Sequence, residues 1–583
     1  MHNKTPDTIS LEQADTIPAL FRERVAKTPD KVAYIQHNPA TKQWEEMTWS
    51  EAAEQVGRWQ SSLSKEGLEP GERVALMLRN CREWVFFDIA AQGLGLVTVP
   101  IYTNDRAENI GYILKDANAR ILLVGDHEQW TTIQQISHPL PELKKIVVLD
   151  QLEEALPDHA VQVATWLSDQ SADIAVNTTD THAMASIVYT SGTTGLSKGV
   201  MLSHRNMLWN IEAGLGTIDV YPEDQFLSFL PLSHTLERTA GYYLAMSTGA
   251  CVAYARSIPL LGEDLVTIKP TIIVSVPRIF ERVYAKIQKK LEGESSFKKK
   301  LFNKTVDVGW KCFLHQQKRP GGASGGLLWS ILEHLVAKKV QAKLGGKLRF
   351  AVSGGAALSP DIARFFIGLG IPIVQGYGLT ETSPVIACNP IDDNIPASVG
   401  PPLSGVEIMV GENDELLSRS PSVMLGYWKN QSATDDIIDS DGWLHTGDKV
   451  RVDANNHIYI TGRLKEIIVL STGEKVPPAD MESAIQLDPL FEQTLVLGEG
   501  KPYLVALIVL DPEQETHLTN EQILAKVSQQ LRSFPGYATV RRVTIIDEAW
   551  TVENSLFTPT LKPRRTKIME CYEAEIKAMY AGH

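Results

Sequence analysis

A run of glycines and hydroxyl-bearing residues follows an apolar stretch at residues 186–206, SIVYTSGTTGLSKGVMLSHRN. Glycines let backbone N–H groups approach a ligand closely, and the hydroxyls together with Lys198 can reach phosphate oxygens. The spacing differs from a Walker A loop: Ser197 stands where that motif needs its second glycine, and Gly199 replaces its Ser or Thr. The stretch therefore predicts an anion-binding loop of another class, and a plain polar surface turn is the alternative.

Later stretches share this character. They are RFAVSGGAALSP (349–360), IVQGYGLTETSP (373–384), DGWLHTGDKVRVD (441–453) and YITGRLKEIIVLSTGEKVPP (459–478). Small residues at the end of a strand leave room for a flat ring against the backbone. A lone carboxylate in a phosphate-binding loop, here Glu381, makes sense with a metal ion between it and the phosphates. Asp448 is placed to accept hydrogen bonds from ribose hydroxyls, although alone it reads as a turn residue.

The pattern of predicted helices and strands, which must position these residues, changes along the chain. Strand-like and helical patterns alternate through the first part, which indicates parallel sheets covered by helices on both faces. From about residue 400 short strands with turn signals are typical of an antiparallel sheet or barrel. After residue 462 mixed strands and helices resume, so the sequence predicts more than one domain in 583 residues.

Composition excludes several classes of protein. The net charge of −14 argues against a nucleic-acid-binding protein. The five cysteines are far apart and form no CxxC pair, which indicates a reducing compartment and no metal cluster. The first 20 residues lack the apolar core of a signal peptide, and the uncharged run 239–255 is too short to span a bilayer. We therefore expect a cytoplasmic protein without an integral membrane segment.

Taken in order, YTSGTTGLSKGV, GYGLTET, TGD, GRLKE and PTLKPRR resemble the motifs of the adenylate-forming superfamily of acyl-CoA synthetases, luciferases and peptide-synthetase adenylation domains. These motifs span residues 189–565. LSFLPLSHTLER (227–238) and a long helical insert look like those of long-chain fatty acyl-CoA synthetases. The resemblance implies an α/β fold whose large N-terminal domain holds two parallel-sheet subdomains and a β-barrel-like subdomain, followed by a small mobile α+β C-terminal domain. The boundaries it suggests are a domain at 1–462 with the insert at 286–345, a hinge at 463–466 and a lid domain at 467–583.

The resemblance also implies roles for single residues. Catalytic roles fall to Lys562, Glu381, Lys198 and Thr380, of which Thr380 would contact the α-phosphate; Thr190 and Glu381 would hold Mg²⁺. Nucleotide contacts fall to Tyr189, Thr190, Ser191, Gly192, Thr193, Thr194 and Gly195 around the phosphates; to Gly354, Gly355, Ala356, Gln375, Gly376, Tyr377 and Gly378 around adenine; and to Asp448 and Arg463 at the ribose. Lys465 matches the hinge and His234 the wall of the acyl pocket. Ser197 replaces the proline usual in the phosphate loop, and Pro563 directly follows Lys562 and fixes the backbone there.

The implied activity uses ATP, Mg²⁺ and CoA to convert a fatty acid to acyl-AMP and then to acyl-CoA. An acyl-AMP ligase that delivers to a carrier protein shares the first half-reaction, and its extra insertion would block domain rotation. A luciferase-like oxygenase and a non-catalytic binding module are further alternatives; the intact Lys198, Glu381, Arg463 and Lys562 argue against the module. Acyl chain length and oligomeric state, including a homodimer, stay open.

The insert carries a Lys-rich segment, KIQKKLEGESSFKKKLFNK (286–304), and an amphipathic pattern at 327–340. The simpler interpretation is a solvated helical face with a surface loop. The alternative is a peripheral contact of 286–340 with the inner face of a membrane, through which a lipid-soluble acid would reach the enzyme.

Overall fold

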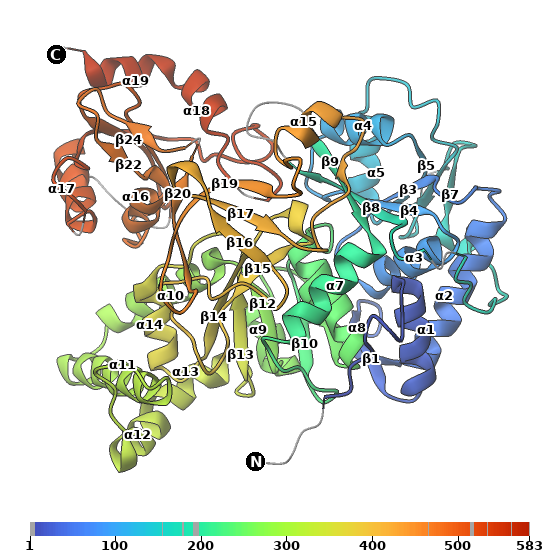
Figure 1. The fold of residues 1–583 in the computed structure, drawn as a ribbon, viewed down its shortest axis with the longest axis horizontal. Helices are drawn as coiled ribbons and strands as arrows, with labels where there is room; N and C mark the ends of the chain where they lie inside the picture. Colours follow the sequence, from blue (N-terminus) through green and yellow to red (C-terminus); the bar gives the residue numbers. More distant parts are fainter. Residues whose placement is uncertain are drawn as a thin grey trace.

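The computed structural model describes residues 6–153, 155–177, 180–190, 197–464, 466–512, 518–532, 534–560 and 562–581. Within these residues, two sheets of eight strands each form the body of the large N-terminal part. An antiparallel sheet and a small C-terminal unit follow them in the chain (Figure 1). The α/β class expected from the sequence, with a large N-terminal and a small C-terminal part, is confirmed.

The first sheet carries a hairpin, β8–β9, whose strands flank the predicted phosphate loop. Its order is β18-β9-β8-β4-β3-β5-β6-β7, with β3 parallel to β4 and β5 and with β9 antiparallel to both β8 and β18. Its strands are β3 (Arg73–Met77), β4 (Val97–Pro100), β5 (Ala119–Val124), β6 (Lys145–Val148), β7 (Ala160–Gln162), β8 (Met184–Thr190), β9 (Lys198–Ser203) and β18 (Gly426–Tyr427). The inner strands are nearly uniform apolar runs, because both faces of a parallel sheet are buried.

The second sheet has the order β15-β14-β13-β12-β10-β11-β1-β2, parallel from β14 to β1 and antiparallel at both edges. Its strands are β1 (Val32–Asn38), β2 (Gln43–Thr48), β10 (Gln225–Ser228), β11 (Cys251–Tyr254), β12 (Ile272–Ser275), β13 (Phe350–Ser353), β14 (Ile373–Gly378) and β15 (Val385–Cys388). The carboxyl ends of β13 and β14 are adjacent, since Ser353 pairs with Gln375. Two of the candidate nucleotide-binding stretches begin at these ends.

Helices cover both sheets. In the N-terminal part they are α1 (Ile17–Lys27), α2 (Trp49–Ser64), α3 (Arg82–Gly93), α4 (Ala107–Asp116), α5 (His127–Gln134), α6 (Val163–Trp166), α7 (His204–Leu215), η1 (Glu237–Tyr243), α8 (Leu244–Thr248), α9 (Leu261–Ile268), α10 (Pro277–Glu292), α11 (Ser296–Gln316), α12 (Gly326–Leu332), η2 (Glu333–Ala337), α13 (Lys338–Lys343), α14 (Pro360–Gly368), η3 (Thr380–Thr382), η4 (Glu412–Asp414) and α15 (Gln431–Asp435). Their starts follow sequence signals: at α2 the Thr48 side chain accepts from the Glu51 N–H, and Glu51 binds back to the Thr48 N–H.

The antiparallel unit follows the point near residue 400 where the sequence changes to short strands with turn signals. Its described strands are β16 (Glu407–Val410), β17 (Glu415–Arg419), β19 (Leu444–Val452) and β20 (Ile458–Arg463), in the order β16-β17-β19-β20. The expectation of a barrel-like subdomain corresponds to this sheet. The edge strand β20 ends at Arg463, beside the predicted hinge, and Lys465 lies outside the described residues.

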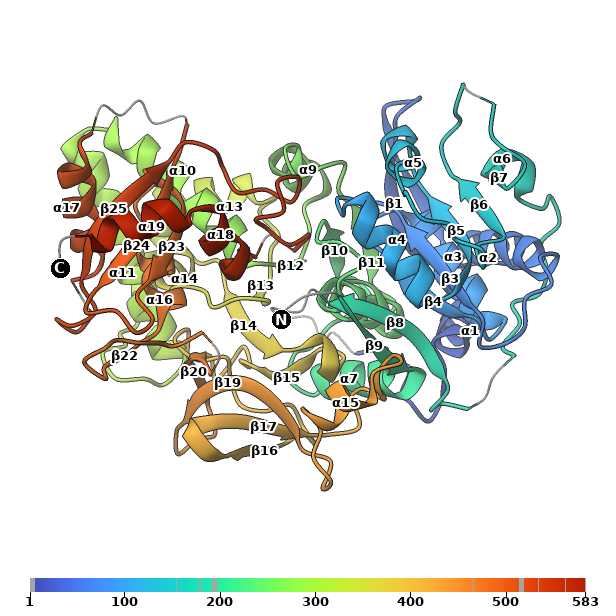
Figure 2. The same ribbon diagram turned by 90° about the horizontal axis from the view of Figure 1, so that it is seen from above.

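The C-terminal unit is a mixed sheet with helices. Its strands are β21 (Ile468–Val469), β22 (Lys475–Val476), β23 (Phe491–Leu497), β24 (Leu504–Leu510) and β25 (Val540–Ile546), and its helices are α16 (Pro478–Ile485), α17 (Asn520–Gln530), α18 (Arg565–Cys571) and α19 (Glu573–Tyr580). β24 pairs antiparallel with β23 and parallel with β25. Figure 2 shows this unit on the side of the second sheet and the insert helices, with the first sheet opposite. There Arg278 of α10 donates to the Glu492 carbonyl at 3.0 Å.

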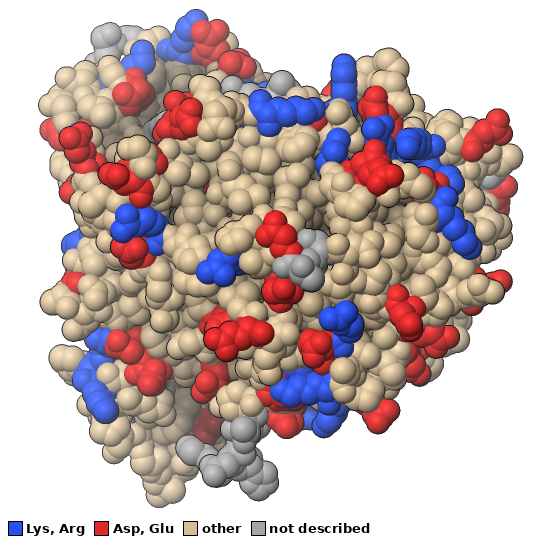
Figure 3. All heavy atoms as spheres, turned by 45° about the vertical axis from the view of Figure 1, so that its right-hand side comes forward, with Lys and Arg blue, Asp and Glu red and all other residues tan. Residues whose placement is uncertain are grey.

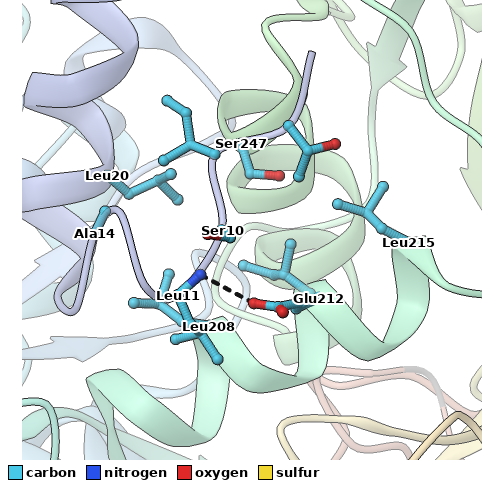
Figure 4. A pocket seen from close by; sticks show the side chains of 11 residues that line it. Ser10, Leu11, Ala14, Leu20, Leu208, Glu212, Leu215 and Ser247 are labelled. Atoms are coloured by element: carbon cyan, nitrogen blue, oxygen red, sulfur yellow. Dashed lines mark hydrogen bonds between the residues drawn. The ribbon is translucent and has the colours of Figure 1, made fainter. Parts of the chain in front are cut away.

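The surface charge and the volume of the cavity described below bear on where a ligand-binding site can lie. On the face shown in Figure 3, acidic and basic side chains are interspersed, and no single basic area covers it. A cavity of about 10 Å³ lies between the N-terminal segment and α7, where the Leu11 N–H donates to Glu212 at 2.9 Å (Figure 4). That volume holds about one water molecule, and none of the predicted site residues lines it. Among the described residues, no helix is long and apolar enough to cross a bilayer.

Candidate active site

The predicted phosphate loop connects β8 and β9. The hairpin pairs Thr190 with Lys198 and Tyr189 with Gly199, so both ends of the loop are fixed by strand hydrogen bonds. The Tyr189 hydroxyl donates to Asp116 of α4 at 2.6 Å, which ties the base of the hairpin to the neighbouring helix. The turn itself lies outside the described residues, and with it the predicted contacts Ser191, Gly192, Thr193, Thr194 and Gly195.

Lys198 and Glu381 both contact the side chain of Tyr427. The Tyr427 hydroxyl donates to Glu381 Oε1 at 2.7 Å, and Lys198 Nζ lies 4.8 Å from the centre of the Tyr427 ring. Tyr427 is on β18, which pairs with β9, so the sheet itself positions this contact. Burial, and then the Glu381 charge, raise the pKa of Tyr427, so the phenol keeps its proton and stays a donor. Thr380 belongs to the same short helical turn as Glu381.

This arrangement fits Mg²⁺ better than a transition metal. No group of three or more His, Cys, Asp or Glu suited to a metal occurs in the part of the chain that the structure describes. Mg²⁺ keeps several waters and is bound by one or two carboxylates together with substrate phosphates. Glu381 is such a carboxylate, and both of its oxygens carry lone pairs beyond the one that Tyr427 occupies. Thr190, at the end of β8, is the hydroxyl that the family resemblance assigns to the same ion.

The two glycine-rich stretches leave the ends of β13 and β14 without room for larger side chains. A Cβ on Gly354 would lie 3.0 Å from Leu236, and Gly355 has a φ of +79°, which a side chain rarely tolerates. A Cβ on Gly378 would lie 1.8 Å from the Pro384 carbonyl oxygen, so glycine is required there as well. Ala356 follows Gly355, and Gly376 pairs with Cys388 on the edge strand. Bare backbone at strand ends is what the predicted adenine contact would need, because a flat ring can then lie against it.

Gln375 differs from the simple expectation of a ligand contact. Its side-chain amide is hydrogen-bonded within the protein at both atoms. Oε1 accepts from the Leu358 N–H at 3.0 Å, and Nε2 donates to the Pro396 carbonyl at 2.5 Å. Its side chain therefore holds the loop after β13 against β14. Tyr377, two positions on, is the aromatic group of this stretch that reaches the opposite subdomain.

Tyr377, Asp448 and Arg463 form one polar cluster. Asp448 is buried; it accepts a hydrogen bond from the Tyr377 hydroxyl at 2.6 Å and forms an ion pair with Arg463, whose Nε lies 2.9 Å from Asp448 Oδ1. Strand register brings Asp448 and Arg463 together, because they are directly opposed on β19 and β20. Burial, and then Asp448, raise the pKa of Tyr377, so this ring also remains a neutral donor. The cluster places an anion and a cation where the second sheet meets the antiparallel sheet.

Lys562 reaches this cluster from the C-terminal unit. Its ammonium is dehydrated between the two domains, although much of the side chain stays accessible, and Arg463 adds a second cation; both effects lower the pKa of Lys562. Burial, and then Lys562, lower the pKa of His234 to about 4, so His234 is neutral and close to that lysine. His234 Nδ1 accepts from the Leu236 N–H at 3.1 Å, which fixes the ring. Residues far apart in the sequence thus meet in one place.

A buried acid beside His234 was not expected from the sequence. Glu237 begins the π-helical segment η1 and is 1% exposed, and its Oε2 has no hydrogen-bond partner among the described residues. Burial raises its pKa to about 8. A Cβ on Gly241 would lie 2.5 Å from Glu237 Oε1, so a glycine is needed beside this side chain. The only sequence signal is one carboxylate at the start of a long uncharged run, which reads as the edge of a core segment.

Comparisons with known proteins agree with this geometry. The AMP-binding enzyme family matches residues 21–428, and the AMP-binding enzyme C-terminal domain matches residues 465–583. The chain belongs to the AMP-binding enzyme family. It is 31% identical to the long-chain-fatty-acid–CoA ligase FadD15 of Mycobacterium bovis, over 99% of this chain and 98% of that protein. It is 28% identical to the chloroplastic long-chain-fatty-acid–[acyl-carrier-protein] ligase AEE15 of Arabidopsis thaliana, over 97% of this chain and 86% of that protein.

A solved structure shares the fold over the whole chain. The anthranilate CoA ligase AuaEII, crystallised with anthranoyl-AMP, superposes with a TM-score of 0.76, covering 98% of this chain and 99% of that one at 22% identity. This likeness shows the fold, whereas the family match and the 31% identical relative confirm the membership of the adenylate-forming superfamily that the ordered motifs predicted.

Proposed function

We propose that this protein joins a long-chain fatty acid to CoA in two steps, through an acyl-AMP intermediate, with MgATP as the energy source. The observation that carries the proposal is that Lys562, on the C-terminal unit, lies near enough to Arg463 and His234 for the Arg463 charge to lower the pKa of Lys562 and for the Lys562 charge to lower the pKa of His234. It is supported by the full-length similarity to a ligase named for long-chain fatty acids and CoA.

In the first step a carboxylate oxygen of the acid attacks the α-phosphorus of ATP, and pyrophosphate leaves. Both reactants are anions, so the site must neutralise charge and align them. Lys562 and Lys198 are the cations that this chain brings to the site, and Tyr377, Asp448 and Arg463 would hold the nucleoside. Thr380 and the loop hydroxyls would bind phosphate oxygens. Mg²⁺, held by Glu381 and Thr190, would supply further positive charge at the phosphates.

In the second step the thiol of CoA attacks the acyl carbonyl, the thiol proton departs, and AMP leaves with the oxygen that came from the acid. In the present arrangement Lys562 lies near enough to His234 to lower its pKa. It must move away before a thiol can enter, which requires rotation of the C-terminal unit about residues 463–466. We assign the hinge to Lys465 and take 467–583 as the moving domain, with 1–462 as the fixed one.

The acceptor and the chain length are tested together. Pyrophosphate release is measured with MgATP and acids from butyrate to stearate, each with no acceptor, with CoA, and with phosphopantetheinylated acyl carrier protein. We expect activity to rise with chain length and turnover to need CoA. Turnover with the carrier protein alone would favour the function named for the Arabidopsis relative. Absence of pyrophosphate release with every acid would remove the adenylation proposal itself.

The insert offers a face for drawing such an acid from a lipid surface. Leu327, Leu328, Ile331 and Leu335 are 78%, 46%, 47% and 46% exposed along α12 and η2, while Leu332 on the other face is 3% exposed. This apolar stripe continues into the exposed Lys338 and Lys339. Figure 1 shows α12 at the lower edge of the molecule, away from both large sheets. Exposed leucines followed by lysines complement an anionic bilayer.

The apolar stripe is a better candidate for membrane contact than the Lys-rich segment 286–304. Lys298 pairs with Glu294 at 2.6 Å, and Lys299 donates to the Glu292 carbonyl at 2.8 Å, so both are partly engaged within the insert. We expect co-sedimentation with vesicles of phosphatidylcholine and phosphatidylglycerol, weakened by salt. Binding should be lost in Leu327→Ser/Ile331→Ser.

The matched control is Met409→Ser/Val410→Ser, because these residues on β16 are 42% and 45% exposed and lie outside the insert. Binding that is lost equally in the control, or kept in Leu327→Ser/Ile331→Ser, would contradict a specific role for the stripe. If the protein instead forms dimers that the stripe substitutions dissociate, the stripe is an interface between copies of the chain.

A further inference from the structure

The segment before α4 contacts the loop that carries Lys562. Asn104 Nδ2 donates to the Pro559 carbonyl at 3.3 Å, and Arg106 Nη1 donates to Ser555 Oγ at 2.6 Å. In Figures 1 and 2 the red segment before α18 reaches across to α4. These bonds join the large domain to the C-terminal unit at the loop itself, a few residues from Lys562.

A buried carboxylate gives this segment its shape. Asp105 is 6% exposed; its Oδ1 accepts from the Arg106 N–H at 2.8 Å, and its Oδ2 accepts from Asn109 Nδ2 of α4. Arg106 and Arg564, one from each domain, both lie near this carboxylate. Burial raises the pKa of Asp105, and these hydrogen bonds and cations oppose the rise. Asp105 thus holds Asn104 and Arg106 in position to face the other domain.

The same segment is tied to the phosphate-loop hairpin. Asn109 Oδ1 accepts from Ser197 Oγ at 3.3 Å, and Ser197 directly precedes Lys198 at the start of β9. The base of the phosphate loop, the segment 104–109 and the Lys562 loop therefore form one chain of hydrogen bonds. The Lys562 loop is closed on itself as well: the Lys562 N–H donates to Thr558 Oγ1 at 3.0 Å, and the Thr558 N–H donates to the Lys562 carbonyl at 2.9 Å.

We propose that Asn104, Asp105 and Arg106 form a docking segment that holds the Lys562 loop in place for adenylation and releases it for thioester formation. These are positioning residues, since they act through the loop and touch no reacting atom. The inference rests on the proposed two-step function. The contacts suit a reversible role, because hydrogen bonds at a domain surface are replaced by bonds to water when the domains separate and cost little net free energy.

The test compares the two half-reactions in single variants. Arg106→Ala should lower the rate of acyl-AMP formation, measured as pyrophosphate release, by about tenfold, the effect of losing one charged hydrogen bond. Acyl transfer from preformed acyl-AMP to CoA should be unchanged. Ser555→Ala should have a similar effect, and Arg106→Ala/Ser555→Ala should be no slower than either single variant. Arg106→Lys should restore part of the rate.

Arg79→Ala is the matched control, since Arg79 is an exposed arginine of the same domain whose carboxylate partner, Asp126, is 3.7 Å away and on the same domain. It should leave both half-reactions unchanged. Equal losses in both half-reactions for Arg106→Ala, or additive losses in the double variant, would overturn the proposal.

A second readout does not depend on activity. Hydrogen exchange at residues 555–564 should be faster in Arg106→Ala than in the wild type, because the loop spends more time undocked. Exchange should be unchanged in Arg79→Ala. If exchange in Arg106→Ala matches the wild type, the docking segment fails even when the protein proves to be a ligase. If the wild type releases no pyrophosphate with any acid while exchange responds as expected, the docking contact stands and the proposed function fails.

Discussion

Replacing Lys562 with alanine should separate the two half-reactions most sharply. Lys562 is the cation that the C-terminal unit brings to Arg463 and His234. Removing one preorganised charge from a transition state costs about 3–4 kcal/mol, or roughly a hundred- to a thousandfold in rate. Acyl-AMP formation should fall by that factor. Acyl transfer from preformed acyl-AMP to CoA should change by less than about twofold, because that step uses the rotated arrangement.

The pH dependence gives an independent check on the same residue. Dehydration and Arg463 lower the pKa of Lys562, so it loses its proton, and adenylation its rate, at a lower pH than an ordinary lysine would. Lys562→Arg keeps the charge and should shift this alkaline limb to higher pH. The assay is pyrophosphate release against pH, with Lys577→Ala as the control, since Lys577 is an exposed lysine of the same unit. Equal loss of both half-reactions in folded Lys562→Ala, or an unmoved alkaline limb in Lys562→Arg, would refute the reasoning.

Further predictions concern the metal and two buried titrating groups. Glu381→Gln should raise the Mg²⁺ concentration needed for pyrophosphate release, since a neutral amide is a poor ligand for a hard cation; an unchanged Mg²⁺ titration would place Glu381 outside the metal shell. Burial lowers the pKa of His204, which is 2% exposed, from 6.5 to about 4. The free energy of unfolding should therefore fall by about 3 kcal/mol as the pH drops from 6.5 to 4, and urea unfolding of His204→Asn should not show this fall. Glu237 has a pKa raised from 4.5 to about 8, so its stabilisation is complete below pH 4.5 and is lost as the pH rises through 8; Glu237→Gln should therefore unfold at a higher temperature than the wild type at pH 8, and an equal or lower Tm would contradict the buried neutral acid.

The sequence predicted those parts of the site that depend on local order. The order of apolar strand and glycine-rich stretch predicted Gly354 and Gly378 at strand ends, where the structure has them. The pairing of Asp448 with Arg463 was not predicted, although it joins two strands that are neighbours in the chain. The motifs gave the family because their order along the chain is specific. Contacts between domains were different: the roles of Lys562 and His234 came only from the resemblance, and their proximity was not predicted, since no local pattern encodes how two domains dock.

Other features had weak or no sequence signals. The contact of Asn104 with Pro559 joins two loops that belong to different domains and carry no motif. The π-helical start at Glu237 depends on side-chain packing against Gly241, which periodicity does not report. Tyr427, which links Lys198 to Glu381, sits in a two-residue strand too short to give a pattern. The roles assigned to all the site residues stay predictions, including those of Lys465 and of the loop 191–196.

The central claim is that the acid is activated by bonding to the α-phosphorus of ATP. The most direct test is to incubate the enzyme with MgATP, CoA and a long-chain fatty acid labelled with ¹⁸O in its carboxylate. Mass spectrometry then measures the ¹⁸O content of the AMP and the pyrophosphate. The account predicts one ¹⁸O atom in AMP and none in pyrophosphate, because the attacking oxygen stays with the α-phosphoryl group when the thiol displaces AMP. Label in orthophosphate with formation of ADP, or unlabelled AMP alongside acyl-CoA, would contradict it.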